Sequence, residues 1–142
     1  MGSEFAMGRS SLVGEFKATV GGQFVACNAA LARMLGYASP EELMGVDLRD
    51  LYVGENDRDR FLVELNTKGH VINYALTLRQ RNGRIVHLLE SATIIRHTDR
   101  SSYIEGTLVD VTHLHQAEQE QRQLLDNYRQ LLERVREAVL VL

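Results

Sequence analysis

The stretch VINYALTLRQRNG, residues 71–83, decides the fold class of this chain. In its first part the even-numbered positions are apolar, whereas most of the odd-numbered positions are polar. This period of two predicts a strand with one buried and one solvent-facing side. The side chains expected on the buried side are Ile72, Tyr74, Leu76 and Leu78. Because Asn82-Gly83 is a strong signal for a tight hairpin turn, we expect this strand to pair antiparallel with the next one.

Two further strands are predicted on the C-terminal side of this hairpin. Residues 85–95 are apolar on both faces, and residues 103–111 form the last strand after a polar turn at 97–101. A strand that is apolar on both faces needs cover on both sides of the sheet. Something besides short helices is therefore expected to pack on the outer face of this sheet.

The N-terminal part is predicted to hold a second hairpin and a short helix. The runs 15–20 and 23–27 flank Gly21-Gly22, a pair that can adopt the positive φ angles of a tight turn. Asn28 is expected to cap the helix that follows, and Gly36 is expected to end it.

Two more helices are expected before residue 70. Residues 39–42, SPEE, have the pattern of a capping box with proline in the first turn. An amphipathic helix is predicted over residues 57–68, with Gly69 as its stop. The first four residues of this helix, DRDR, alternate in charge, which is typical of a solvated helix start.

Residues 113–142 contain no glycine or proline and are predicted to form one long helix. Apolar residues recur along it in steps of three and four, which is the a/d heptad pattern of a coiled coil. The stripe expected to form a dimer contact includes Leu114, Leu124, Tyr128, Leu131 and Val135. Since one small domain cannot bury a stripe of this length, a homodimer is predicted.

Composition excludes several classes of protein. The chain has 142 residues, 44% hydrophobic and 25% charged, the usual mix of one soluble globular domain. No apolar run approaches the roughly 20 residues of a membrane-spanning helix, so no membrane contact is expected for this fragment. The 16 basic and 19 acidic residues give a net charge of −3, which argues against a nucleic-acid partner.

The cysteine content bears on the cellular location of the protein, and the first residues bear on whether a signal peptide is present. A single cysteine, Cys27, excludes an internal disulfide and suits a reducing, cytoplasmic location. Residues 1–8, MGSEFAMG, lack the basic and apolar regions of a signal peptide, and we expect them to be an expression-vector leader.

Several strings, in the right order, resemble the PAS domain family. Residues 24–31, FVACNAAL, resemble its second strand and the asparagine that opens its first helix. Residues 35–45, LGYASPEELMG, are similar to its LGY-SPEEL-G segment, and residues 81–83, RNG, resemble its R-x-G hairpin. Residues 104–112, IEGTLVDVT, resemble its closing strand with the terminal D-I/V-T motif. The resemblance covers residues 12–112.

The resemblance implies an α+β fold, the PAS fold. Its five-stranded antiparallel sheet would have short helices on one face and a long helix at its C-terminal end. The PAS domain would span residues 12–112, and a signalling, coiled-coil helix would span residues 113–142. Residues 128–142 also resemble the lead-in helix and first strand of a second PAS domain, which leaves open that such a domain starts there.

No cofactor, neither haem nor flavin, is expected from the family's known signatures. Some PAS domains hold haem through a histidine on the long helix, but residues 57–68 contain no histidine. The photoactive flavin branch has its reactive cysteine in an N-C-R-F-L-Q string, whereas Cys27 lies in VACNAA. We expect Cys27 to be a small buried hydrophobe. The scattered histidines offer no convergent metal ligands, and no catalytic constellation is visible, so no metal site and no enzyme activity are predicted for this fragment.

The function implied by the resemblance is that of a sensory and dimerisation module in a multidomain signal-transduction protein. Such a parent would be a sensor histidine kinase of a two-component system or a cyclic-dinucleotide enzyme. The module would form a homodimer through its sheet face and its C-terminal helix. Asp110 and Thr112, at the junction of sheet and helix, are expected to pass the signal on, and Thr112 is suited to cap the helix.

An alternative function is a small-molecule or cofactor sensor with an occupied internal pocket. The apolar side of the 71–81 strand, together with Cys27, would line such a pocket. Simple packing of these residues into the core is the preferred interpretation. The tyrosine hydroxyl of Tyr74 would need a polar partner if it were buried.

Overall fold

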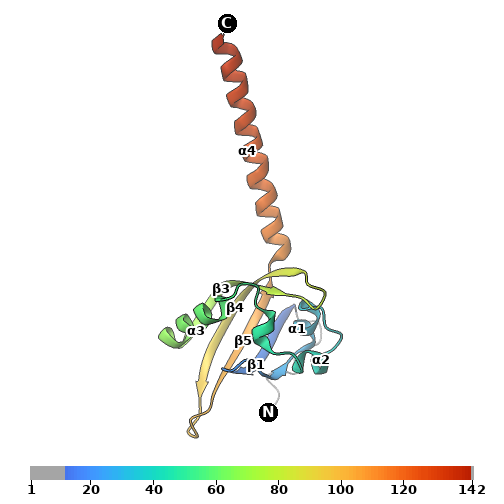
Figure 1. The fold of residues 1–142 in the computed structure, drawn as a ribbon, viewed down its shortest axis with the longest axis vertical. Coiled ribbons are helices and arrows are strands. Elements are labelled where there is room, and N and C mark those ends of the chain that lie inside the picture. The colour runs from blue at the N-terminus through green and yellow to red at the C-terminus, as the bar shows by residue number, and fades with distance from the viewer. Residues whose placement is uncertain (1–11, 142) are drawn as a thin grey trace. The chain divides into compact units, whose positions relative to one another are not determined.

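The structure is a computed structural model that describes residues 12–141 of the chain. The predicted vector leader, residues 1–8, lies outside the described residues. The elements, in order, are β1 (Val13–Thr19), β2 (Phe24–Cys27), α1 (Ala29–Met34), α2 (Pro40–Met44), the 3₁₀ helix η2 (Leu48–Leu51), α3 (Asp57–Lys68), β3 (His70–Arg79), β4 (Ile85–Arg96), β5 (Ser102–Asp110) and α4 (Thr112–Val141) (Figure 1). The described part divides into two compact units, which meet in sequence between Val111 and Thr112.

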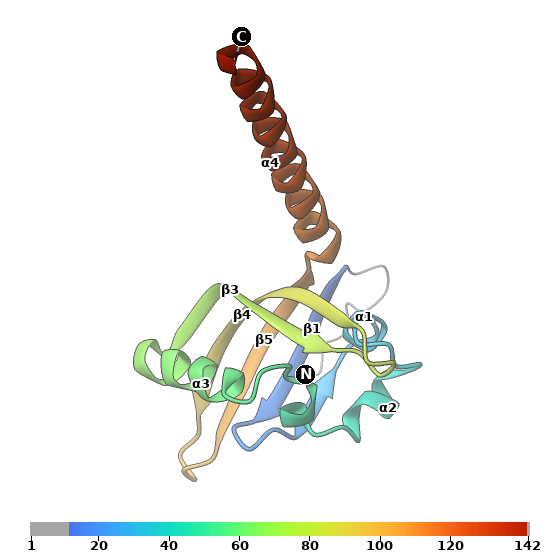
Figure 2. The ribbon, with the colours of Figure 1, turned by 45° about the horizontal axis from the view of Figure 1, so that its top comes forward.

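The first unit is built on one five-stranded antiparallel sheet with the strand order β2-β1-β5-β4-β3. The last strand, β5, therefore lies at the centre of the sheet, between β1 and β4 (Figure 2). The helices α1, α2 and α3 lie on one face, and the opposite face has no helix of this unit over it among the described residues (Figure 2). The predicted α+β architecture is confirmed.

The helices begin and end where the sequence indicates. Ser39 accepts a hydrogen bond from the Glu42 amide at the start of α2, and Gly69 ends α3 with a φ of 81°. Positive φ values suit glycine because it has no Cβ to clash with the backbone. The apolar sides of the helices meet the sheet in a single core, whose most deeply buried side chains are Phe61, Leu31, Leu35, Leu43, Leu65, Leu88 and Ile104.

Asn28 ties the first helix to the first strand. Its side-chain oxygen accepts hydrogen bonds from the Leu31 amide and the Glu15 amide, each at 3.0 Å. Its side-chain nitrogen donates to the Val13 carbonyl at 3.0 Å. Since Asn28 is only 4% exposed, these bonds satisfy a polar group that burial would otherwise penalise. The predicted helix cap thus also joins α1 to β1.

Strand β3 contains a bulge that the alternating sequence pattern does not reveal. Val71 pairs with Ala92 and Tyr74 pairs with Glu90, so β3 has one residue more than β4 across this step. Asn73, in the bulge, has a φ of 52°. The extra residue shifts the alternation, with the result that Val71 is buried and Ile72 is 72% exposed. The prediction that Ile72 lies on the buried side is therefore wrong.

The second unit is the 30-residue helix α4. It starts one residue before the predicted boundary, and residues 128–141 are helical, so no strand begins in that part. All the large apolar side chains of its heptad pattern that the structure describes are at least half exposed in this single chain. They are Leu114, Leu124, Leu125, Tyr128, Leu131, Leu132, Val135 and Val139.

Candidate functional site

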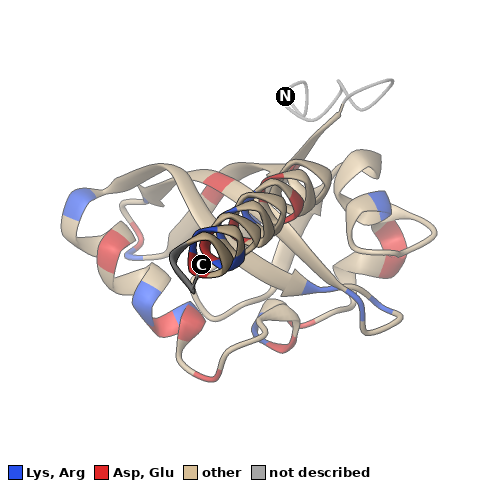
Figure 3. Cartoon of the chain, turned by 90° about the horizontal axis from the view of Figure 1, so that it is seen from above, with Lys and Arg blue, Asp and Glu red and all other residues tan. Residues whose placement is uncertain are grey.

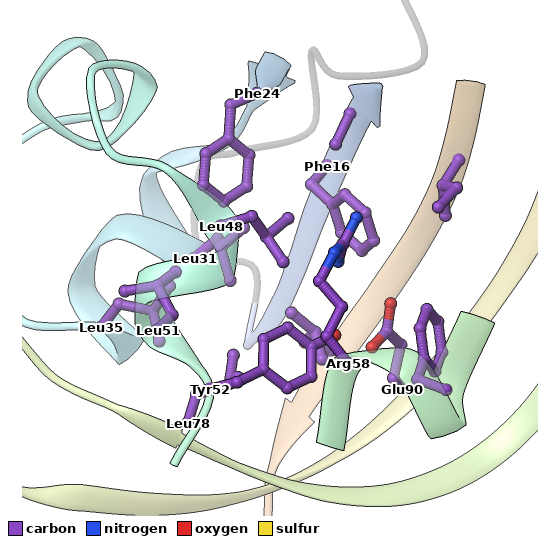
Figure 4. A pocket seen from close by; sticks show the side chains of 14 residues that line it. Phe16, Phe24, Leu31, Leu35, Leu48, Leu51, Tyr52, Arg58, Leu78 and Glu90 are labelled. Atoms are coloured by element: carbon purple, nitrogen blue, oxygen red, sulfur yellow. The ribbon is translucent and has the colours of Figure 1, made fainter. Parts of the chain in front are cut away.

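The core of the first unit encloses a small cavity between the sheet and the helices (Figure 4). Its volume is about 20 Å³. That volume is close to what one water molecule needs. The lining side chains come from every layer of the fold and are mainly apolar, and three of them bear polar groups. The lining comprises Phe16, Ala18, Phe24, Leu31, Leu35, Leu48, Leu51, Tyr52, Arg58, Phe61, Leu78, Glu90, Ile104 and Leu108.

Arg58 enters this cavity from the first turn of α3. Its side chain is only 8% exposed, and its Nη2 donates a hydrogen bond of 2.9 Å to the carbonyl oxygen of Val20. The guanidinium also lies over the ring of Tyr52, at 5.7 Å from the ring centroid. The prediction of a fully solvated helix start is therefore wrong at this position. Of the four charged residues only Arg58 points into the protein, because it lies on the same helical face as Phe61.

Glu90 approaches the same cavity from β4. It is 4% exposed, and it shares the core-facing side of the strand with Leu88 and Ala92. Burial raises the pKa of its carboxyl to about 8, and the nearby positive charge of Arg58 opposes this rise only in part. At neutral pH the neutral form of this carboxyl is therefore favoured.

Tyr52 completes the polar group in the cavity. It follows η2 and forms an isolated antiparallel bridge with Leu78 of β3. Burial raises the pKa of its hydroxyl strongly, the charge of Glu90 adds to the rise, and Arg58 opposes it. Tyr52 therefore keeps its proton. We call the three residues Tyr52, Arg58 and Glu90 the polar cluster.

Sequence reasoning missed this polar cluster. The strand 85–95 was interpreted as apolar on both faces, which passed over the glutamate in the middle of it. A usable signal was present, because Glu90 is in phase with Val86, Leu88 and Ala92. Arg58 precedes Phe61 by three positions and so lies on the buried helical face.

The predicted pocket residues are only partly brought together. Leu78 lines the cavity, whereas Tyr74 and Leu76 pack at the edge of the core. The ring of Tyr74 meets that of Phe61 edge to face, with centroids 5.2 Å apart. Ile72 lies outside, as described above.

Cys27 lies at the edge of the fold and not in the cavity lining. Its thiol donates a weak hydrogen bond to the carbonyl oxygen of Pro40 at 3.6 Å. Burial, with a smaller contribution from Glu41, raises the pKa of this thiol to about 11. A thiol that stays protonated is a poor nucleophile. Cys27 is only half-buried, so it is less buried than predicted.

The two predicted coupling residues flank the boundary between the units. Asp110 is the last residue of β5, and Thr112 is the first residue of α4. Between them, the Val111 amide donates a hydrogen bond of 2.8 Å to the carbonyl oxygen of His87 in β4. The central strand of the sheet is therefore followed by the long helix after a single residue.

Residues 12–141 hold no group of three or more His, Cys, Asp and Glu side chains that could bind a metal ion. Within the same range, no helix is both long and apolar enough to cross a membrane. Charged residues of both signs are interspersed over the helices and loops (Figure 3).

Comparison with known proteins identifies the family. A profile described as a PAS domain matches residues 15–113. The probable diguanylate cyclase DgcE of Escherichia coli (strain K12) is 34% identical over 109 residues, which is 74% of this chain. The chain spans only 10% of the length of that protein.

Solved structures share the fold. A PAS domain from a two-component sensor histidine kinase superposes with a TM-score of 0.61 at 22% identity, covering 71% of this chain and 86% of that one. A domain of a sensory box sensor histidine kinase/response regulator from Geobacter sulfurreducens gives a TM-score of 0.58 at 21% identity, covering 74% of this chain and 89% of that one. The ordered motifs, the sheet and the profile match agree, and the chain therefore belongs to the PAS domain family of signalling sensor modules.

Proposed function

We propose that this chain is the sensory and dimerisation module of a multidomain signalling protein, and that it passes changes in the PAS unit through β5 to α4. The single observation that carries the proposal is the apolar stripe along α4. A helix that exposes a stripe of large apolar side chains has a strong tendency to bury them against a partner.

The stripe fits a second copy of the same helix. Leu114, Leu124, Tyr128, Leu131 and Val135 recur at a and d positions of a heptad, and each is between 55% and 70% exposed. A second set, Leu125, Leu132 and Val139, widens the apolar face towards the C-terminal end. Self-pairing of α4 would remove both sets from water at once.

The uncovered face of the sheet is a second contact that we propose for the dimer. Ile72 is 72% exposed on this side of the molecule, and Val109 of β5 is 40% exposed. The residues along this face also include polar groups, such as Glu15, Glu105 and Thr107. A mixed surface of this kind suits a contact that supplements α4 better than one that acts alone.

The output would lie elsewhere in the parent protein. We propose a kinase or cyclase domain downstream of α4, as the names of the related proteins suggest, and we propose that this chain has no catalytic activity of its own. Its balanced charge and its single cysteine support a cytoplasmic location without a nucleic-acid partner.

We further propose that the module works without a bound haem or flavin. A cavity of about 20 Å³ has room for a water molecule, and a haem or flavin would require the core to repack. The alternative is a sensor with an occupied pocket. The absorption spectrum of the purified protein and mass spectrometry of a denatured extract distinguish this alternative from a module without a bound cofactor. A Soret band, a flavin spectrum or a stoichiometric small molecule would support that alternative.

Cysteine cross-linking tests the proposed helix contact. Single cysteines at Leu124 and Leu131 are introduced into a Cys27→Ser background, alone and mixed, beside the off-stripe control Gln130→Cys. Pairing along the stripe predicts rapid disulfide formation at stripe positions, in like pairs for parallel helices and in mixed pairs for antiparallel ones. Equal cross-linking at Gln130, or none at any stripe position, would refute the proposal.

A further inference from the structure

Glu90 stands out among the described residues because it is a carboxyl group that is almost fully buried in the core. It is 4% exposed and faces the cavity beside Arg58 (Figure 4). Burial raises the pKa of its carboxyl, and the positive charge of Arg58 opposes that rise. A buried carboxylate without a direct partner is strongly disfavoured, whereas a buried carboxylic acid needs one acceptor for its proton.

The neighbours of Glu90 leave it few ways to stay charged. The cation that acts on it is Arg58 from α3, whose guanidinium already donates to the Val20 carbonyl. Tyr52 after η2 and Tyr74 of β3 are the other titratable groups that it influences, and both are neutral phenols. The cavity residues supplied by β1, α1 and β5 are apolar: Phe16, Ala18, Leu31, Leu35, Ile104 and Leu108.

We propose that Glu90 is a buried protonation site that switches the bonding of Arg58. The neutral carboxyl keeps its proton, donates a hydrogen bond through its O–H to a water molecule in the cavity, and leaves Arg58 bonded to Val20. When the proton is lost, the guanidinium turns from the Val20 carbonyl to the new carboxylate. Since Val20 lies in the β1–β2 turn and Arg58 in the first turn of α3, proton loss loosens α3 from that turn. This inference concerns the PAS unit by itself and does not depend on the proposed dimer.

The direction in which pH changes the folding stability follows from the raised pKa of the Glu90 carboxyl. The pKa of Glu90 is raised in the folded protein to about 8, whereas an unfolded glutamate keeps its usual value of 4.5. Between these values the folded state binds the extra proton, so stability is fully present at acidic pH and falls as the pH rises towards 8. One proton difference lowers the folding equilibrium constant by up to about tenfold per pH unit within that window.

The test is an NMR titration of the full chain labelled with ¹³C in its glutamate side chains. The Glu90 carboxyl carbon is expected to titrate with a midpoint near pH 8. The guanidinium signals of Arg58 and the amide signals around Val20 are expected to move with the same midpoint. A midpoint near the ordinary glutamate value, or an Arg58 that ignores the titration, would overturn the proposal.

A matched pair of variants tests the energetic side. Glu90→Gln mimics the neutral acid and is expected to remove the fall in urea stability between pH 5 and 8, while the exposed control Glu55→Gln retains it. If Glu90→Gln keeps the same pH slope as the original chain, the proposal is wrong. Should Glu90→Gln not fold, the titration of the unaltered chain still decides.

Discussion

Gly106 lies in β5 at the point where the strand crosses between Phe16 of β1 and Ala92 of β4. A Cβ atom at this position would lie 2.7 Å from the backbone oxygen of Ser91 and 2.9 Å from the Phe16 ring. Since the backbone oxygen cannot move without disturbing the sheet, we expect Gly106→Ala to lower the free energy of unfolding by about 1–3 kcal/mol. Urea denaturation measures this difference.

The control for that substitution is Gly45→Ala, at the end of α2. The nearest atom to a Cβ there is 3.7 Å away, and the φ of −84° suits any residue. This variant is expected to be neutral or slightly stabilising, by up to about 1 kcal/mol, because alanine restricts the unfolded chain. Equal losses in both variants would contradict the close approach at Gly106.

Val71 and Ile72 test the bulge in β3 directly. Val71 is 4% exposed and Ile72 is 72% exposed. We therefore expect Val71→Ala to cost about 1–3 kcal/mol of stability and Ile72→Ala to change it by no more than about 0.5 kcal/mol. The reverse order of the two losses in thermal or urea unfolding would mean that β3 follows the regular alternation after all.

The limits of sequence reasoning are visible at single residues. Alternation correctly predicted the buried Leu78, but a bulge depends on φ angles and cross-strand pairing that no local pattern encodes, so Ile72 was misplaced. Arg58 and Glu90 were not predicted to be core residues, because charged residues are rarely buried. Their positions in the helical and strand periodicity nevertheless match those of buried neighbours. The turn residues were predicted well, since Asn82-Gly83 fixes its hairpin through local backbone preferences.

At the scale of elements, most of the helices and strands were predictable. The caps at Asn28 and Ser39 are confirmed, and each acts through bonds to its own first turn. The strand order was not accessible from composition or periodicity. The family resemblance implied a five-stranded antiparallel sheet but no strand order. Pairing of β1 with β5 joins residues that are far apart in sequence, which no local pattern indicates. The edges of the elements moved by only one or two residues.

The junction of β5 and α4 is where we expect element-scale coupling. Thr112 begins α4 and Asp110 ends β5. We predict that Asp110→Ala in the full-length parent leaves the PAS unit folded but uncouples its input from the output activity, and that Thr112→Ala acts in the same direction. Melting temperature and output activity are measured side by side for both variants.

The signalling role of this junction would be contradicted by a loss of output activity in proportion to the loss of stability. If output falls only as far as the lost stability explains, the two residues have a structural role and the signalling role is wrong. A control at Thr107, on the outer face of β5 but away from the junction, separates general weakening of the strand from a specific effect at its end.

In the whole molecule, the two units differ in how far their apolar residues are buried. The PAS unit buries its apolar residues in its own core, whereas α4 exposes a stripe that begins at Leu114 and extends to Val139. The proposed dimer reconciles them, because pairing of α4 buries this stripe and leaves the PAS unit intact. Burial of apolar area at roughly 25 cal/mol per Å² makes such a stripe a substantial driving force.

Sedimentation equilibrium of the full chain at tens of micromolar tests the proposed pairing of α4. We expect the mass of two chains for the unaltered protein and for the off-stripe control Gln130→Asp. We expect the mass of one chain for Leu131→Asp, because a charge at a d position would be buried in the pair. A monomeric unaltered chain, or a Leu131→Asp variant that remains dimeric like its control, would show that α4 does not pair along this stripe.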